Sequence, residues 1–197
     1  NGLWKYQVTE MNRKKKDVHY GDEILVPFSI ESSLSGVEGQ FGPSDKLWYR
    51  KEFTIDPDWK GKQILLHFGA VDYECQVWVN NILVGKHTGG NNPFSFNITR
   101  FLKKDGKLNQ RGIWYTPVSG IWQTVWIEPV NPVYIRQMCP ETNIENSTVK
   151  LHFDIAESVG DESLLVKVFD GEKNILTSEQ KLGKDIELQI PGLVWWS

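Results

Sequence analysis

Alternation of apolar and polar residues is the feature of this sequence that most constrains its fold. Ile64, Leu66 and Phe68 fall on one face of an extended chain, while Leu65 and His67 fall on the other. The same pattern recurs along the 197 residues, with Gly, Pro, Asn and Asp between the runs. No long segment shows the helical period. Many short strands joined by frequent turns indicate an all-β sandwich or barrel.

A hairpin is predicted at Asn80-Asn81, between an alternating run that ends at Val79 and an apolar run that begins at Ile82. A two-residue type I′ turn needs positive φ at both positions, and asparagine adopts this conformation at lower cost than most residues. Residues 49–55 alternate in the same way and predict a further strand, which stops at an Asp-Pro-Asp turn.

A Pro-Val-Asn-Pro segment at residues 129–132 is the predicted boundary between two domains, residues 1–130 and residues 131–197. Beyond it aromatic residues become fewer and the alternation becomes cleaner. Three runs in the second domain predict strands with one apolar face: Val149, Leu151, Phe153 and Ile155; Leu164, Val166 and Val168; and Ile186, Leu188 and Ile190.

The second domain is expected to be incomplete. Its pattern accounts for about four strands, whereas an immunoglobulin-like sandwich needs about seven. The sequence also stops at Trp195-Trp196-Ser197, within an apolar run. We therefore expect the chain to be truncated.

Charge and hydropathy argue against two classes of partner. The net charge is −3, and the basic run at residues 13–16 is followed at once by Asp17, so clustered Lys and Arg for phosphate contacts are lacking. No stretch approaches the roughly 20 apolar residues of a membrane span. The sequence therefore predicts neither a nucleic-acid partner nor a membrane partner.

The cysteines and histidines predict no metal site and no cofactor. Cys75 and Cys139 lack metal-site spacing and could pair or stay free, and we favour two buried thiols. The four histidines, at positions 19, 67, 87 and 152, do not cluster in the sequence. His67 and His152 fall on polar strand faces, where an exposed or hydrogen-bonded side chain is expected.

A series of short motifs is the most specific signal in the first domain. In chain order they are G-D-E-I-L-V-P-F from Gly21, W-Y-R-K-E-F from Trp48, F-G-A-V-D from Phe68, V-W-V-N from Val77, P-F-S-F from Pro93 and S-G-I-W-Q from Ser119. In this order they resemble the sugar-binding domain of glycoside hydrolase family 2. Residues 130–197 resemble, with less specificity, the immunoglobulin-like second domain of that family.

The resemblance implies a jelly-roll β-sandwich followed by a truncated immunoglobulin-like β-sandwich. In the family, which includes β-galactosidases, β-glucuronidases and β-mannosidases, a catalytic TIM barrel follows these two sandwiches. Retaining hydrolysis needs two carboxyl groups about 5–5.5 Å apart, and the family carries its acid/base in an Asn-Glu dipeptide. This sequence contains no such dipeptide. We therefore expect no catalytic residue and no activity from the chain alone.

The function that the resemblance implies is that of a non-catalytic N-terminal region of a retaining exo-β-glycosidase, β-galactosidase-like. It would pack on the TIM barrel of the same polypeptide and form part of the pocket wall for a terminal β-linked sugar. It would also support contacts between subunits of a homo-oligomer. By analogy with family members, export to a periplasm or the outside is expected. The alternatives are a stand-alone carbohydrate-binding module and a structural spacer.

Three residues are the candidates for substrate binding. The resemblance implies that Asp72 reaches into the sugar pocket and accepts hydrogen bonds from sugar hydroxyls; the alternative is that it caps a turn. Trp114 and Tyr115 could stack on a sugar ring, or they could belong to the core or cover the barrel interface. Some relatives carry an Asp near Trp114, which this chain lacks.

The family has a further strand and a polar loop where this sequence has only Lys107 between Gly106 and Leu108. A missing central strand would leave backbone groups unpaired. We therefore expect that the protein has this strand and loop and that a disordered stretch has been left out of the sequence, rather than that the protein itself lacks them.

Overall fold

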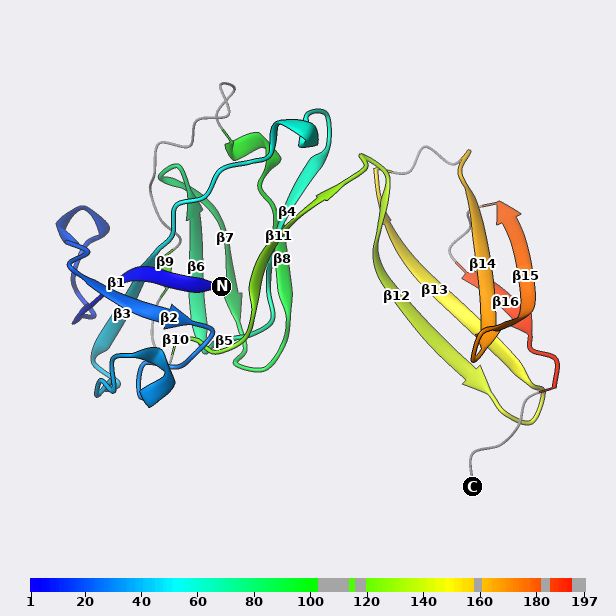
Figure 1. Cartoon of the computed structure of the whole chain (residues 1–197), viewed down its shortest axis with the longest axis horizontal. Coiled ribbons are helices and arrows are strands. Elements are labelled where there is room, and N and C mark those ends of the chain that lie inside the picture. Colours follow the sequence, from blue (N-terminus) through cyan, green and yellow to red (C-terminus); the bar gives the residue numbers. More distant parts are fainter. Residues whose placement is uncertain (103–113, 116–119, 158–160, 182–184, 193–197) are drawn as a thin grey trace. The chain divides into compact units, whose positions relative to one another are not determined.

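The computed structural model describes residues 1–102, 120–157, 161–181 and 185–192, together with the backbone of 114–115. Within these residues the only helices are single 3-10 turns, so the predicted all-β class is confirmed (Figure 1). The chain divides into two compact units, Asn1–Val130 and Asn131–Ser197. None of the described helices is long and apolar enough to cross a membrane.

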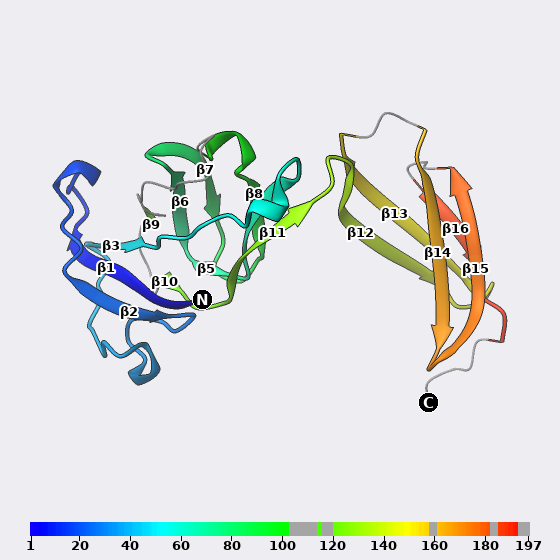
Figure 2. The ribbon, with the colours of Figure 1, turned by 45° about the horizontal axis from the view of Figure 1, so that its top comes forward.

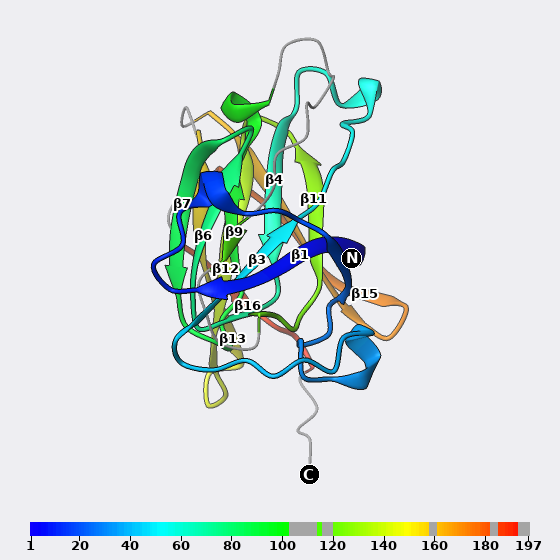
Figure 3. The ribbon, with the colours of Figure 1, turned by 90° about the vertical axis from the view of Figure 1, so that its left-hand side faces the viewer.

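The first unit is built from antiparallel sheets. Its strands are β1 (Gly2–Glu10), β2 (Asp22–Val26), β3 (Asp45–Arg50), β4 (Gln63–Phe68), β5 (Val71–Asp72), β6 (Glu74–Val79), β7 (Ile82–Thr88), β8 (Phe94–Asn97), β9 (Trp114–Tyr115), β10 (Gly120–Ile121) and β11 (Val125–Val130). They pair in the orders β2-β1-β3, β7-β6-β9, β11-β4-β8 and β10-β5 (Figure 3). The 3-10 turns are η1 (Lys15–Asp17), η2 (Ser33–Ser35), η3 (Pro57–Trp59) and η4 (Thr99–Phe101).

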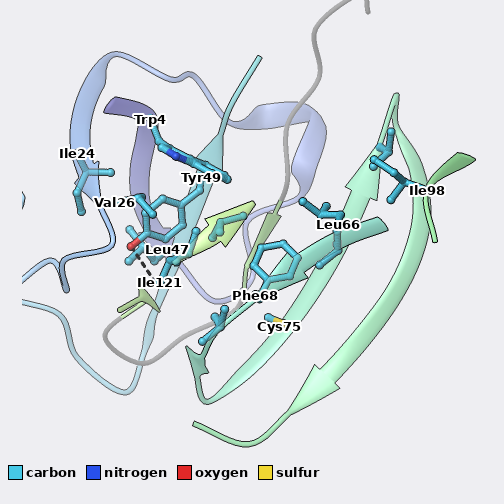
Figure 4. Packing of buried hydrophobic residues seen from close by; sticks show 14 of the residues in the cluster. Trp4, Ile24, Val26, Leu47, Tyr49, Leu66, Phe68, Cys75, Ile98 and Ile121 are labelled. Carbon is cyan, nitrogen blue, oxygen red and sulfur yellow. Dashed lines mark hydrogen bonds between the residues drawn. The ribbon is translucent and has the colours of Figure 1, made fainter. Parts of the chain in front are cut away.

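One hydrophobic core joins these sheets, because the apolar faces of their strands meet inside the unit. Figure 4 shows its centre, where side chains of β1 to β3 face those of β4, β6 and β10. Ile64, Leu66 and Phe68 are all buried in it, which confirms the predicted inward face of β4. Within the β2-β1-β3 sheet, the aromatic rings of Trp4 and Tyr49 pack edge to face, with their centroids 6.3 Å apart.

The β6–β7 hairpin turns at Asn80 and Asn81, as predicted. Their φ values are 51° and 71°, and Val79 pairs with Ile82 across the turn. The Asn80 side chain also donates a 2.7 Å hydrogen bond to the carbonyl of Phe101, which ties the hairpin to η4. Asparagine therefore serves here both as a turn residue and as a link to a distant segment.

The strand predicted over residues 49–55 is wrong in its second half, because β3 ends at Arg50. Arg50 is the last residue that pairs with β1, opposite Lys5, and the chain then leaves the sheet. Phe53 and Ile55 still pack against the core. Their alternation therefore reflects one-sided burial rather than membership of a described strand.

The second unit has five described strands in two sheets. They are β12 (Tyr134–Asn143), β13 (Thr148–Ala156), β14 (Ser163–Asp170), β15 (Lys173–Lys181) and β16 (Asp185–Gln189). The sheets β12-β13-β16 and β14-β15 enclose a small core around buried Leu151, Ile186, Leu188 and Ile190 (Figure 2). Leu164, Val166 and Val168 pack against it, so the predicted apolar face of β14 is confirmed.

The two cysteines differ, and the prediction of two buried thiols is half wrong. Cys75 on β6 is fully buried, and this burial raises the pKa of its thiol to about 12. Cys139 is exposed on the edge strand β12, directly opposite His152 on the polar face of the sheet. Both thiols are free. Because Cys139 is preceded by inward-facing Met138, the strand period turns it outward.

Candidate functional site

Asp72 lies in the short strand β5, which pairs with β10 at one end of the first unit (Figures 1 and 2). Asp72 faces Gly120, and Val71 faces Ile121. Val71 and Ile121 are fully buried, whereas Asp72 is half-buried. Two core side chains therefore anchor the strand pair, and the carboxylate follows directly after one of them.

Tyr49 connects this strand pair to the core. The backbone N–H of Ile121 donates a 3.4 Å hydrogen bond to the Tyr49 hydroxyl, drawn as a dashed line in Figure 4. Burial raises the pKa of Tyr49 well above its ordinary value, so this hydroxyl stays neutral. Gly120 has a φ of 79°, and a side chain there would collide with Tyr49. The close approach of backbone and phenol therefore fixes β10, and with it the position opposite Asp72.

Among the residues that the structure describes, the Asp72 carboxylate has no hydrogen-bond or ion-pair partner. A turn-capping aspartate would accept a hydrogen bond from a nearby backbone N–H, and none of the described N–H groups provides one. The peptide bond that follows Asp72 is cis, and Tyr73 is exposed. The site thus offers a half-buried acceptor beside an exposed aromatic ring.

Gly90, in the loop between β7 and β8, lies against the Asp72 side chain. A Cβ added to Gly90 would be only 2.6 Å from Asp72 Oδ1. Two hydrogen bonds hold this loop: Trp122 Nε1 donates to the carbonyl of Gly90 at 2.8 Å, and the N–H of Gly89 donates to the carbonyl of Tyr73 at 2.8 Å. Three segments distant in sequence therefore meet here, and Gly90 is the one that lies against the carboxylate.

His87 supports the same loop from the β7 side. Its Nε2 lies 3.2 Å from the carbonyl of Gly89, and its ring stacks on Phe94 at 3.9 Å. Phe94 in turn stacks on core residue Phe68 at 4.9 Å. Gly89 has a φ of 129°, a backbone conformation that favours glycine. Gly90 is small for a different reason, because a side chain that arrives from another strand lies against it.

Trp114 and Tyr115 form β9, which pairs with β6. Tyr115 lies opposite Cys75, and Trp114 lies opposite Gln76. This register brings the backbone of β9 beside the strand that begins just after Asp72. The side chains of both residues, and the Gly106 to Leu108 region, lie outside the described residues. Their predicted contacts with sugar therefore stay predictions.

No group of three His, Cys, Asp or Glu side chains in the described part of the chain could hold a metal ion. His67 on β4 contacts Glu128 at 3.1 Å and stacks on Trp126 at 4.7 Å. His152 on β13 contacts Glu141 at 3.2 Å and Asp185 at 2.8 Å. The prediction that these two histidines are exposed or hydrogen-bonded is confirmed for His152. His67 is largely covered, and its contact with Glu128 lacks hydrogen-bond geometry.

Comparison with protein families gives a match to the model described as "Glycosyl hydrolases family 2, sugar binding domain", over residues 1–111. Among curated relatives, a β-galactosidase of Thermoanaerobacter pseudethanolicus is 26% identical over 168 residues, which cover 73% of this chain and 23% of that protein. A β-glucuronidase of Paenibacillus borealis is 27% identical over 130 residues, covering 64% of this chain and 22% of that protein.

Solved structures with the same fold include the β-glucuronidase of Ruminococcus gnavus, with a TM-score of 0.73 and 19% identity. The alignment covers 99% of this chain and 38% of that one. A Faecalibacterium prausnitzii β-glucuronidase gives a TM-score of 0.71 at 16% identity. The chain therefore spans less than a quarter of these two curated relatives and about two fifths of these solved chains.

Proposed function

Because the chain belongs to glycoside hydrolase family 2, we propose that it is the non-catalytic N-terminal region of a retaining exo-β-glycosidase. In this role it packs on a catalytic TIM barrel of the same polypeptide. The match of the family's sugar-binding domain over residues 1–111 supports the assignment. The share of its relatives that the chain spans leaves ample length for a catalytic domain outside residues 1–197.

Within that role, Asp72 forms part of the wall of the sugar pocket. The observation that carries this proposal is a half-buried carboxylate that is fixed by β10 and Gly90 and has no partner among the described residues. A carboxylate can accept hydrogen bonds from two hydroxyl groups of a terminal sugar. The substrate we favour is a β-galactoside, since the relatives include a β-galactosidase that aligns with 73% of this chain. A β-glucuronide is the alternative, because other relatives are β-glucuronidases.

Substitution of Asp72 tests the proposal in the full-length protein that carries this chain. Asp72→Ala should lower kcat/KM for 4-nitrophenyl β-D-galactoside by about 10- to 100-fold, the range expected for loss of a hydrogen bond to a charged group. Asp72→Asn, which keeps one acceptor oxygen, should lose less. Asp17→Ala changes an exposed carboxylate of the same unit and is the matched control. Wild-type kinetics for Asp72→Ala, on both the galactoside and the corresponding glucuronide, would rule out a role in the pocket.

A stand-alone carbohydrate-binding module is the second candidate, and one observation favours it. Trp126 is 44% exposed on the outer face of β11, and its ring stacks on His67. A flat exposed ring of this kind suits the apolar face of a sugar. Titration of residues 1–197 with galacto-oligosaccharides separates the two candidates, since a binding module should respond and Trp126→Ala should abolish the response.

We also propose export to a periplasm or to the cell exterior, and contacts between copies of the full-length protein. Export follows by analogy with family members that degrade extracellular polysaccharide, and the contacts between copies follow from the role that the resemblance implies for this chain. Cell fractionation tests the first proposal. Light scattering on the purified full-length protein tests the second, and a monomer mass would refute it.

A further inference from the structure

A chain of contacts leads from the indole of Trp122, through the backbone of Gly90, to the Asp72 carboxylate. Trp122 follows β10, Gly90 lies between β7 and β8, and Asp72 ends β5. The 2.8 Å hydrogen bond from Trp122 Nε1 to the carbonyl of Gly90 joins the first two segments. The close approach of Gly90 to Asp72 Oδ1 joins the second and third.

We propose that Trp122 is a positioning residue for Asp72 and that it acts through Gly90. This inference rests on the proposed role of Asp72 in the sugar pocket. Trp122 holds the Gly90 backbone against one side of the carboxylate, so that Asp72 keeps its orientation without a hydrogen bond to any described residue. The oxygens then remain available to sugar hydroxyls, and the loop supplies steric rather than polar support.

The packing around Gly90 shows what a side chain there would displace. A Cβ at this position would lie 2.6 Å from Asp72 Oδ1 but 3.4 Å from Asp72 Cβ. The first distance is far below van der Waals contact, while the second is an ordinary contact. Gly90 is not among the residues with positive φ, so its backbone accepts alanine without strain. The cost of Gly90→Ala therefore arises from the Asp72 carboxylate.

A double-mutant cycle in the full-length protein tests this coupling directly. Gly90→Ala should lower kcat/KM for 4-nitrophenyl β-D-galactoside nearly as much as Asp72→Ala does. In the Asp72→Ala background it should change nothing further, because that background has no carboxylate to displace. Gly21→Ala is the matched control, since a Cβ there meets open space at an ordinary φ.

Trp122→Phe tests the other half of the inference. It keeps an aromatic ring but removes the N–H donor, so kcat/KM should fall by about 3- to 10-fold, as for a neutral hydrogen bond. The change should fall on the same parameter, KM or kcat, that Asp72→Ala alters. Trp59→Phe, at a half-buried indole in η3, should leave both parameters unchanged.

The outcomes separate this inference from the function on which it rests. If Asp72→Ala lowers kcat/KM while Gly90→Ala and Trp122→Phe match the wild type, the positioning role is wrong and the pocket role stands. If Gly90→Ala costs as much in the Asp72→Ala background as in the wild type, the glycine acts independently and the inference fails. If Asp72→Ala itself has no effect, both proposals fail. Thermal unfolding of each variant shows that a loss is not due to a failed fold.

Discussion

The two units of the chain use the same kind of strand but build different cores. In the first, large side chains such as Tyr49 and Phe68 are fully buried between sheets that cover them on both sides. In the second, the described buried side chains come only from β13, β16 and the residues next to them. Met138, on the inward face of edge strand β12, remains 53% exposed.

This difference shows what positions a functional side chain. Asp72 follows a fully buried valine and pairs with a strand that is itself hydrogen-bonded to Tyr49, so the site is supported by the complete core of the first unit. The polar cluster of the second unit, around His152, lies on an exposed sheet face with no such support. The two regions should therefore respond differently to the same kind of change.

The largest expected effect is that of Phe68→Ala on the first unit. Phe68 is fully buried and stacks on Phe94 at 4.9 Å, so the substitution leaves a large cavity. The free energy of unfolding should fall by about 3–5 kcal/mol. Urea unfolding, with hydrogen exchange read on peptides from residues 1–130, measures it. A loss below about 1 kcal/mol would show that this core is looser than its burial indicates.

Leu188→Ala should have a smaller effect on the second unit. Leu188 is buried, but its core is small and borders the exposed strand β12, so the surroundings can relax into the space. The expected loss is about 2–3 kcal/mol, the low end for a buried leucine. Hydrogen exchange on peptides from residues 131–192 measures it, and Leu165→Ala, at an exposed site on β14, is the control. A loss equal to that of Phe68→Ala would remove the contrast between the cores.

The side-chain faces of the strands could be predicted in both units, because a period of two is a local property of the sequence. It gave the inward residues of β4 and β14, and turn chemistry gave the hairpin at Asn80 and Asn81. The end of β3 could not be predicted, since it depends on where β1 ceases to be a neighbour. Nor could the exposure of Cys139, since the face on which it lies is set by its pairing with His152, after a register shift in β12 between Ile135 and Gln137.

The candidate site was predictable in part. The resemblance predicts a role for Asp72. The residue that packs against it, Gly90, and the residue that is hydrogen-bonded to Gly90, Trp122, come from two other loops. Their contacts are tertiary: no spacing in the sequence relates position 72 to positions 90 and 122. A glycine that is required by a neighbour's side chain, rather than by its own φ, leaves no local signal.

The smallest expected effect is an opposite pH dependence in the two units. Hydrogen bonds to Glu141 and then to Asp185 raise the pKa of His152, although Lys150 opposes this. Its contribution to stability is therefore complete below about pH 6.5, the ordinary histidine pKa, and is lost as pH rises through the raised value. Burial lowers the pKa of His67 despite nearby Glu128, so the first unit loses stability as pH falls below about 6.5.

Hydrogen exchange on peptides of each unit, compared at about pH 5.5 and pH 8 after correction for intrinsic rates, measures both trends. On lowering the pH, protection should rise in β13 and β16 and fall in β4 and β11. His152→Gln should abolish the first trend and leave the second, and His67→Gln should do the reverse. Because His152 is exposed and His67 is largely covered, added salt should weaken only the trend in the second unit. Trends of the same sign in both units would mean that the histidine environments do not control this difference.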